Sequence, residues 1–183
     1  MGGRPSRPRR FATTQVPHSL LYRGAEASIM PTAQKYGVGV LAFSPLAGGM
    51  LSDTWPGGGD AMTNTRASLF LADKYDLSRP ENRGKHDALA ALTALAADSG
   101  LSLIHLAIAF TLSHPAVVSA IVGAGTTTQL ASQLGSAEVQ LSEDLLDAID
   151  VIVPPGTVFD RMDFSYLPPA LVDPALRRRV HAR

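Results

Sequence analysis

Two short loops of small residues carry the clearest chemical signal in the sequence. Residues 44–49 read SPLAGG and follow an apolar run that ends at Phe43, and residues 123–128 read GAGTTT and follow a second apolar run. Neither loop contains a charged side chain. Small residues leave backbone N–H groups exposed and let an anion approach them closely. Both loops therefore indicate a phosphate group held by the backbone.

The second loop leads directly into a helical pattern that begins with threonines. The N-terminus of a helix presents free N–H groups and the positive end of its dipole to an anion. Thr126, Thr127 and Thr128 add hydroxyl donors at this end. In parallel barrels, phosphate sites often lie on the loops after the last two strands. Many α/β proteins nevertheless have small residues at such turns, so spacing alone leaves a phosphate site and an ordinary turn both open.

Three apolar segments that could position these loops are predicted as strands: residues 11–16, 38–43 and 117–124. Between the first two, residues 25–37 place Ile29, Ala33 and Tyr36 on one helical face and stop at Gly37, which predicts a helix with a glycine C-cap. The run at 38–43 is almost continuously apolar, as expected of a strand buried on both faces. A strand, a helix and a strand at this spacing form a right-handed unit with parallel strands.

Further helices are predicted from apolar residues at helical spacing, in residues 86–100, 103–115, 126–137 and 141–153. Ser102 and Ser142 are the expected N-caps of the second and fourth of these segments. Residues 52–85 are rich in Gly, Pro, Asn and Asp and are predicted to form a long loop over a site or a poorly ordered insertion. The chain thus alternates helices with three parallel strands.

The two ends differ from the rest in composition. Residues 1–10 form a basic segment rich in Pro and Gly, which we interpret as a linker or as the stump of a sequence that continues upstream. Residues 157–183 form a tail rich in Pro and Arg that is expected to be loosely held. The predicted folded region is therefore residues 11–156.

Composition excludes several classes of function. Sixteen basic and sixteen acidic residues cancel, whereas a nucleic-acid-binding protein is expected to be strongly basic. The chain has no cysteine, so it has no disulfide and no thiolate metal site, and this suits a cytoplasmic protein. No apolar run approaches the about 18 residues that a membrane helix needs. No pair of histidines has metal-ligand spacing.

Several motifs resemble the aldo/keto reductase family, namely QVPHSLLYRGAEASIMPTAQKYGVGVLAFSPLAGGMLS, TRASLF, LSLIHLAIAFTLSHPAVVSAIVGA and TTTQLASQL. The resemblance runs from about residue 9 to about residue 156 and covers only the C-terminal half of the family. It implies an α/β fold with the last three strands of a (β/α)₈ TIM barrel, and hence an incomplete barrel. It also implies NADP(H)-dependent reduction of aldehydes or ketones, with a small carbonyl compound as the substrate.

The resemblance implies positions for the nicotinamide half of the cofactor. Gln15, at the end of the first strand, would meet the nicotinamide carboxamide. Phe43 matches the aromatic position against which the nicotinamide ring stacks. Ser44, Leu46 and Gly48 would line the pyrophosphate.

The adenosine half would be held further along the chain. Arg66 matches a basic residue that reaches towards the adenosine phosphate. The adenosine end would be gripped by Gly123, Gly125, Gln129, Ser132 and Gln133. The family often has Ser or Arg where this chain has Gly125, and Glu-Asn where it has Ser132-Gln133. These departures imply weaker binding of the adenosine end. Arg66 would then be the main determinant of the preference for NADP over NAD, because a guanidinium binds phosphate strongly.

No catalytic residue is assigned in this chain. The family's catalytic Asp, Tyr, Lys and His lie on strands of the N-terminal half, and no motif for them is present. His18 stands where the family usually has Tyr. His105, at the third position of its helix, is expected to cap or pack. His114, at a helix end, is expected to interact favourably with the C-terminal end of the helix dipole.

Other classes of function stay open. The chain could be a non-catalytic NADP(H)-binding or regulatory module, because barrels of this family also serve as channel-associated subunits. It could also pair with a separate N-terminal half. A reading frame for that half directly upstream would instead indicate a gene fragment or a misplaced start. A monomer is expected to leave Val40, Ala42 and Ile121 unusually exposed on the inner side of the sheet.

Overall fold

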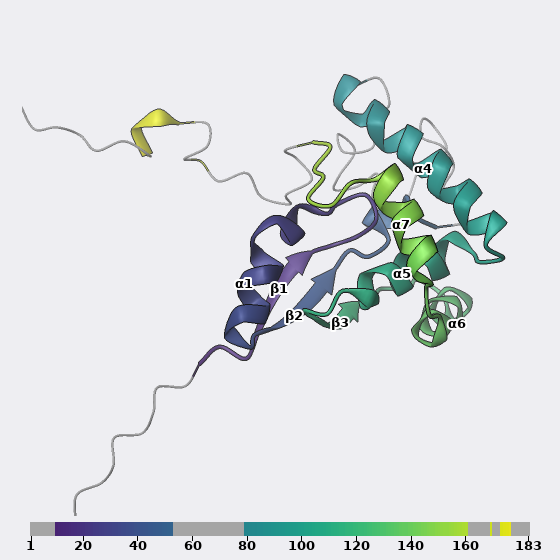
Figure 1. Cartoon of the computed structure of the whole chain (residues 1–183), viewed down its shortest axis with the longest axis horizontal. Helices are drawn as coiled ribbons and strands as arrows, with labels where there is room; N and C mark the ends of the chain where they lie inside the picture. Colours follow the sequence, from purple (N-terminus) through teal and green to yellow (C-terminus); the bar gives the residue numbers. More distant parts are fainter. Residues whose placement is uncertain (1–9, 53–78, 161–168, 170–172, 177–183) are drawn as a thin grey trace, which may run out of the picture.

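The computed structural model describes residues 10–52, 79–160, 169 and 173–176. Its centre is a sheet of three parallel strands in the order β1-β2-β3. The strands are β1 (Thr13–Pro17), β2 (Gly39–Phe43) and β3 (Val117–Ile121). All three were predicted, with bounds that differ by a few residues. Figure 1 shows them side by side.

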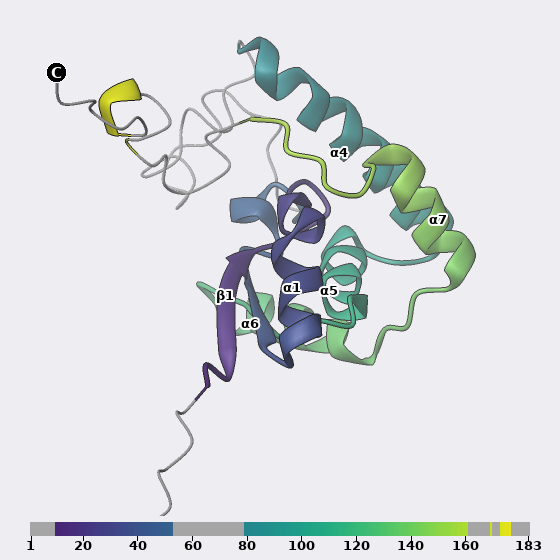
Figure 2. The same ribbon diagram turned by 60° about the vertical axis from the view of Figure 1, so that its left-hand side comes forward.

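Within the described residues, helices cover one face of this sheet and leave the other open. Helices α1 (Ile29–Tyr36) and α5 (Leu103–Ser113) lie on the same side of the strands in Figure 2. Val16 and Val40 point to this side and join a cluster with Met30 and Ala33 of α1. The described part of the chain therefore forms an open α/β sheet.

The prediction that Val40 and Ala42 would be exposed is wrong, because both are 0% exposed. They face the helices, and alternation along β2 turns Leu41 and Phe43 to the open face instead. Ile121, which pairs with Phe43, is exposed as predicted. A strand without alternating polarity does not encode which of its faces meets the helices.

The helix predicted over 25–37 is divided into two elements. A 3₁₀ turn, η1 (Gly24–Ala27), precedes α1, and Ser28 separates them with a φ of −151°. The buried residues of α1 are Met30 and Ala33, so the predicted face was wrong for Ile29 and Tyr36, which are exposed. Gly37 ends the helix with a φ of 66°, as expected of a glycine C-cap.

Helix α4 (Pro80–Asp98) begins six residues before the predicted start, so residues 80–85 are not part of a loop. Pro80 fits the first turn of a helix, where an N–H has no partner. Gly84 lies within the helix because a Cβ there would be 3.0 Å from the ring of Phe159. Close packing, not a chain turn, accounts for this glycine. The rest of the predicted loop, residues 53–78, lies outside the described residues.

Three helices begin with a hydroxyl N-cap, and two of these caps, Ser102 and Ser142, were predicted. Ser102, Thr126 and Ser142 begin α5, α6 (Thr127–Gly135) and α7 (Glu143–Ile152). Each hydroxyl accepts the N–H three residues ahead, at 3.2, 3.2 and 3.3 Å. Short 3₁₀ turns complete the elements: η2 (Ala47–Gly49), η4 (Ser136–Glu138) and η6 (Pro174–Leu176).

The start of the predicted loose tail is packed against the folded region, which corrects the expectation for residues 157–160. The Arg23 N–H donates to Thr157 O at 2.9 Å, and Val158 forms a bridge with Tyr22. Asp160 is buried. These contacts extend the ordered region beyond residue 156.

The lengths of the described helices bear on whether they could span a membrane. No single helix among them is long and apolar enough to cross a membrane. One pair of helices meets the length and composition criteria for a membrane span, but only when the two are joined across a bend of 97°. The pair is Asn82–Asp98 and Leu103–Ser113.

Candidate cofactor-binding site

The loop after β2 has an unusual backbone conformation. Ser44 and Ala47 have φ values of 56° and 47°, and Gly48 and Gly49 have values of 69° and 107°. The left-handed region costs a residue with a Cβ about 1–2 kcal/mol. Two such residues in one short loop are typical of a functional turn that the surrounding structure holds in place.

Hydrogen bonds and apolar contacts hold this loop in its conformation. Within the loop, the N–H of Ala47 donates to Ser44 O at 2.9 Å, and that of Gly49 donates to Leu46 O at 2.8 Å. Met50 and Leu51 follow directly and are buried in the large core cluster formed with α4, α5 and α7. The loop is therefore anchored at its end, while Ser44 and Gly48 stay exposed.

Three backbone donors in this loop are free to bind an anion. Among the residues that the structure describes, the N–H groups of Ser44, Leu46 and Gly48 have no hydrogen-bond acceptor. Ser44 and Gly48 are also exposed. Successive free N–H groups in such turns form concavities that bind anions. These are the three positions at which the sequence predicts contacts with a pyrophosphate.

The two predicted nicotinamide contacts share the open face of the sheet. Gln15 pairs in register with Leu41, and Phe43 follows two residues later on the same side of the strands. Gln15 is exposed and Phe43 is half-buried. The N–H of His18 donates to Phe43 O at 3.2 Å and joins the ends of β1 and β2. This arrangement leaves one surface of Phe43 accessible to a planar group.

The loop after β3 is closed by one of its own predicted ligand residues. Gln129 Oε1 accepts the N–H of Gly125 at 2.9 Å, and the N–H of Gln129 donates to Thr126 Oγ1 at 3.2 Å. Phe43 pairs with Ile121, so this loop and residues 44–49 leave the sheet from neighbouring strands at the same edge. Gln129 shapes the loop here, and its contact with adenosine stays a prediction.

Gln133 has the only buried side chain among the five residues assigned to the adenosine end. It is 6% exposed, and its Nε2 donates to Gly123 O at 3.1 Å. Its Oε1 is buried and has no hydrogen-bond partner among the described residues. A buried acceptor without a donor is costly, so Oε1 is well suited to accept a hydrogen bond from a ligand.

The adjacent Ser132 is held through its backbone. Ser132 O lies 3.1 Å from Nε2 of His105 on α5. A Cβ at Gly135 would be 3.3 Å from the same nitrogen, so α5 and α6 are in close contact here. His105 therefore packs and orients α6, in agreement with the role predicted for it. Arg66 lies outside the described residues.

A buried ionic cluster of His18, Arg23 and Glu26 was not predicted from the sequence. Arg23 Nε lies 2.8 Å from Glu26 Oε1 and 3.0 Å from Oε2, and His18 Nε2 lies 2.8 Å from Glu26 Oε1. Burial alone would raise the pKa of Glu26, but the bonds from His18 and Arg23 outweigh it and lower this pKa. The spacing of Arg23 and Glu26, three residues apart, was the available signal.

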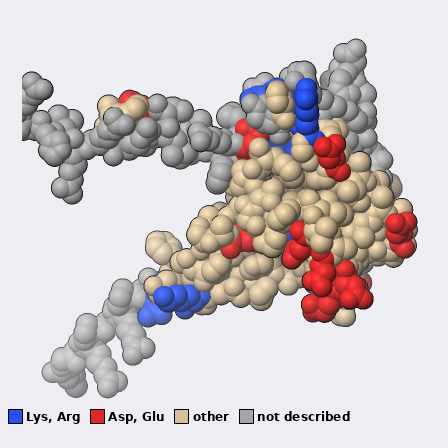
Figure 3. Space-filling view, turned by 45° about the horizontal axis from the view of Figure 1, so that its top comes forward, with Lys and Arg blue, Asp and Glu red and all other residues tan. Residues whose placement is uncertain are grey.

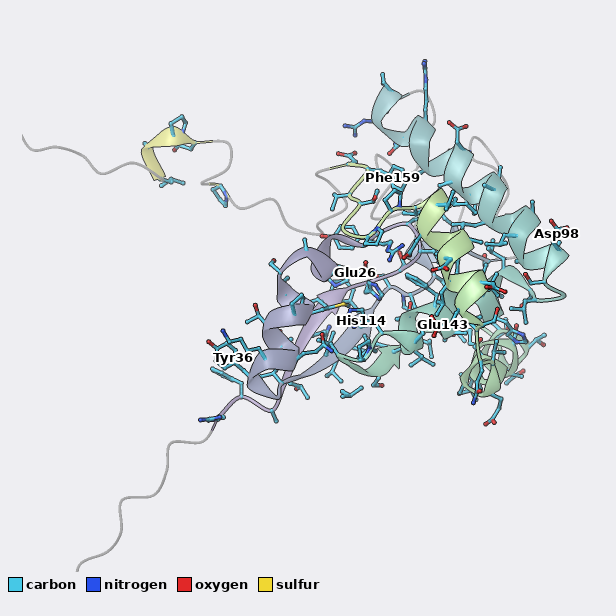
Figure 4. All side chains as sticks on the ribbon, in the orientation of Figure 1. Glu26, Tyr36, Asp98, His114, Glu143 and Phe159 are labelled. Atoms are coloured by element: carbon cyan, nitrogen blue, oxygen red, sulfur yellow. The ribbon has the colours of Figure 1, made fainter. Side chains whose placement is uncertain are left out.

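Aromatic rings enclose the cluster from the side of α5. The ring of Phe110 stacks on His18 at 5.5 Å, and the guanidinium of Arg23 lies 5.0 Å from the centre of Phe110. His114 lies 6.0 Å from His18, and Figure 4 shows it near Glu26 in the middle of the molecule. Burial lowers the pKa of His114, with a further contribution from His18.

His114 does not have the role expected of it at the helix end. Its Nδ1 accepts the N–H of Ala116 at 3.1 Å, which requires an unprotonated nitrogen. The imidazole therefore closes the turn between α5 and β3 as a neutral acceptor, whereas a favourable dipole interaction would need its charged form.

Metal chemistry and a basic surface both lack support in the described part of the chain. No group of three or more His, Asp and Glu residues there could hold a metal ion. On the face in Figure 3, described Lys and Arg side chains gather at the two ends with no broad basic area between them. The arrangement is best suited to binding an anionic ligand through backbone donors at the carboxyl ends of parallel strands.

Comparisons with known proteins agree with this arrangement. The profile of the Aldo/keto reductase family matches residues 6–154. An uncharacterized oxidoreductase of Bacillus subtilis, YrpG, is 34% identical over 153 residues, which are 81% of this chain and 43% of that protein. Protein tas of Escherichia coli is 33% identical over 143 residues, 78% of this chain and 40% of that protein.

A solved structure extends the similarity to the fold. The glycerol dehydrogenase AKR11B4 of Gluconobacter oxydans, an aldo/keto reductase barrel, superimposes with a TM-score of 0.65 at 25% identity. The superposition covers 80% of this chain and 45% of that one. The chain thus spans about two fifths of the length of the curated relatives it matches. The sequence profile, the relatives and the parallel strands together show that this chain belongs to the aldo/keto reductase family and folds as part of its (β/α)₈ barrel.

Proposed function

We propose that this chain carries the NADP(H)-binding half of an oxidoreductase that reduces aldehydes or ketones once its barrel is complete. The observation that supports the proposal most is the set of free N–H groups at Ser44, Leu46 and Gly48. They lie in a left-handed turn that directly follows Phe43. The backbone donors and the ring of Phe43 are therefore close enough in the chain to bind one dinucleotide together.

Each predicted contact has a distinct task in this proposal. Gln15 holds the carboxamide, Phe43 supports the nicotinamide ring, and the free N–H groups of residues 44–48 neutralise the pyrophosphate. Bound NADPH would supply the hydride for the reduction. At the other end, Gln133 Oε1 gains the hydrogen-bond donor that it lacks in the described structure.

The preference for NADP over NAD rests on Arg66 in this proposal. A guanidinium forms two parallel hydrogen bonds with a phosphate, which a ribose hydroxyl cannot replace. Gly123, Gly125 and Ser132 contribute backbone and small side chains around the adenosine, and none of them carries a charge. The positive charge opposite the 2′-phosphate is therefore assigned to Arg66.

Reduction needs groups that this chain is not proposed to supply. A proton donor beside the carbonyl oxygen contributes about 10²–10⁴-fold to the rate. Orientation of the substrate over the nicotinamide contributes still more. We assign both tasks to the remaining strands of the barrel. The activity, the carbonyl substrate and the proton donor thus belong to the completed protein.

A second candidate is a non-catalytic NADP(H)-binding or regulatory module. One relative, 29% identical over 133 residues, is a putative voltage-gated potassium channel subunit beta of Schizosaccharomyces pombe. That name favours a regulatory role for at least one similar protein. Turnover by the completed barrel separates the two candidates, since a regulatory module would bind NADPH without reducing carbonyls at an enzymatic rate.

The proposal is tested by titrating residues 1–183 with NADPH and following quenching of Trp fluorescence and calorimetric heat. Gly48→Ala places a Cβ beside the free N–H groups and should weaken NADPH about ten-fold, a loss of roughly 1.4 kcal/mol. Gly100→Ala is the matched control, because Gly100 has the same φ of 69° but ends α4, away from this loop. Equal effects of both variants, or no binding by the unaltered chain, would count against the site.

A further inference from the structure

His18 connects the end of β1 to the start of the left-handed turn. It follows Pro17, the last residue of β1, and its N–H donates to Phe43 O at 3.2 Å. This distance lies at the long end of the range for an N–H···O hydrogen bond. The bond therefore depends on the groups that hold His18 in place.

The peptide group between Phe43 and Ser44 carries both the acceptor of this bond and one of the free donors. A peptide group is planar, and the described residues have no cis peptide bond, so the C=O of one residue and the N–H of the next point in opposite directions. Since Phe43 O points to β1, the Ser44 N–H points to the side of β3, the neighbour of β2 on its other edge. Residues 123–128 follow β3 on that side.

This peptide group is held at its Phe43 end. The N–H of Ser44 has no acceptor among the described residues, and its φ of 56° is unfavourable for a residue with a Cβ. The bond from Ala47 to Ser44 O holds the following peptide group and not this one. A rotation that broke the bond from His18 would therefore also turn the Ser44 N–H away from its present direction.

The side chain of His18 is buried and is oriented by one hydrogen bond. It is 1% exposed, and its Nε2 lies 2.8 Å from Glu26 Oε1. Its Nδ1 is buried and has no hydrogen-bond partner within the described residues. The ring of Phe110 stacks on the imidazole, and Arg23 holds both carboxylate oxygens of Glu26. Glu26 is thus the group that fixes how the imidazole, and with it the backbone of His18, is placed.

We propose that His18 is a positioning residue for the backbone donors that bind the pyrophosphate. The bond of its imidazole to Glu26 keeps its own N–H on Phe43 O. The planar peptide group then keeps the Ser44 N–H directed at the ligand. His18 itself touches no cofactor atom. The inference rests on the proposed function, because it explains the direction of one donor of that site.

The first test uses residues 1–183 without cofactor. His18→Gln retains an N–H donor at the same number of bonds from Cα, whereas His18→Leu has none. Amide protection at position 18, relative to an unfolded peptide of the same sequence, reports the bond to Phe43 O. The residual dipolar coupling of Ser44 reports the direction of its N–H. We expect His18→Leu to lower this protection about ten-fold, the value of one lost hydrogen bond, and to change the coupling, and His18→Gln to retain most of both.

Two controls identify a general loss of stability. The N–H of Val40 donates to Ala116 O at 2.9 Å on the other edge of β2, so global unfolding would lower its protection as much as that at position 18. Ser142→Ala removes the N-cap of α7 and destabilises the chain without contact to His18. It should lower both protections equally and leave the Ser44 coupling unchanged.

The second test compares two ligands. NADPH contains the pyrophosphate, whereas adenosine 2′-monophosphate shares the adenosine and the 2′-phosphate but has no pyrophosphate. His18→Leu should weaken NADPH about ten-fold and leave the affinity for the monophosphate unchanged. A purely structural role of His18 would weaken both ligands alike.

The inference is wrong if His18→Leu leaves the Ser44 coupling unchanged, or lowers protection at position 18 no more than at Val40. Equal effects of His18→Gln and His18→Leu would also overturn it, since the bond to Glu26 would then be unimportant. So would equal weakening of NADPH and the monophosphate. Failure of the unaltered chain to bind NADPH would count against the proposed function alone, because the first test uses no cofactor.

Discussion

Arg23 Nη1 lies 2.6 Å from Asp150 Oδ1, although 127 residues separate them in the chain. The same nitrogen donates to Val153 O at 2.5 Å and so satisfies a carbonyl at the C-terminal end of α7. Arg23 follows β1 closely, and its side chain is buried. This one guanidinium therefore joins the end of the first strand to the last long helix.

Removal of this guanidinium should destabilise the fold strongly. Arg23→Met keeps much of the volume but leaves Glu26 as a buried carboxylate without one of its two partners, at a cost of about 3–5 kcal/mol. Asp150→Asn should cost at most about 1 kcal/mol, because the side chain of Asp150 is 45% exposed and solvent replaces the lost charge. Urea unfolding followed by circular dichroism measures both. Similar losses for the two variants would contradict this account.

Acid should weaken the fold in two stages. Burial lowers the pKa of His114 below its ordinary 6.5, so the unfolded chain takes up a proton first and stability falls as the pH drops below 6.5. The hydrogen bonds from His18 and Arg23 lower the pKa of Glu26 below its ordinary 4.5. The ionised Glu26 therefore stabilises the fold above pH 4.5, and this stabilisation is lost as the pH falls from 4.5 through the lower pKa of the folded state.

Two variants separate these stages. His114→Gln keeps an acceptor for the Ala116 N–H and should remove the first decline in unfolding free energy while it leaves the second. Glu26→Gln should remove the second decline. Unfolding free energies from pH 3 to pH 8 give the comparison. A first stage that persists in His114→Gln would assign it to another group, such as His86, whose pKa burial also lowers.

Arg66 should determine the preference between the two dinucleotides. In the completed barrel, Arg66→Ala should weaken NADPH by roughly 1.5–3 kcal/mol, the range for a hydrogen bond to a charged group, and should affect NADH little. Arg83→Ala, which removes an exposed charge from α4, is the control and should change neither affinity. Equal weakening of both cofactors would mean that Arg66 has a different role.

Residues 1–183 alone should not reduce carbonyl compounds. The reaction needs a general acid and an oriented substrate, which we assign to the strands outside this chain. NADPH oxidation with a panel of aldehydes measures this, with a longer protein that contains all the strands of the barrel as the comparison. Comparable turnover by the short chain would place catalytic residues within it. Tyr22, Tyr36 and His18 would then be the first to replace.

Much of the local structure could be predicted from the sequence, because its signals act within a few residues. Ser102 and Ser142 cap helices through the N–H three positions ahead, and Gly37 adopts the left-handed conformation that ends α1. The small residues at 44–49 likewise predicted exposed backbone donors, and the structure has free N–H groups at Ser44, Leu46 and Gly48.

Tertiary packing decided the features that depend on distant neighbours. Gly84 lies inside a helix because the ring of Phe159 occupies the space of a side chain, which no local pattern contains. In β2, a run that is apolar on both faces has no alternation, so packing against α1 and its neighbours decided that Val40 is buried and Leu41 is not. The bond from Arg23 to Asp150 follows the same rule, since a contact across 127 residues exists only once the strands and helices have packed.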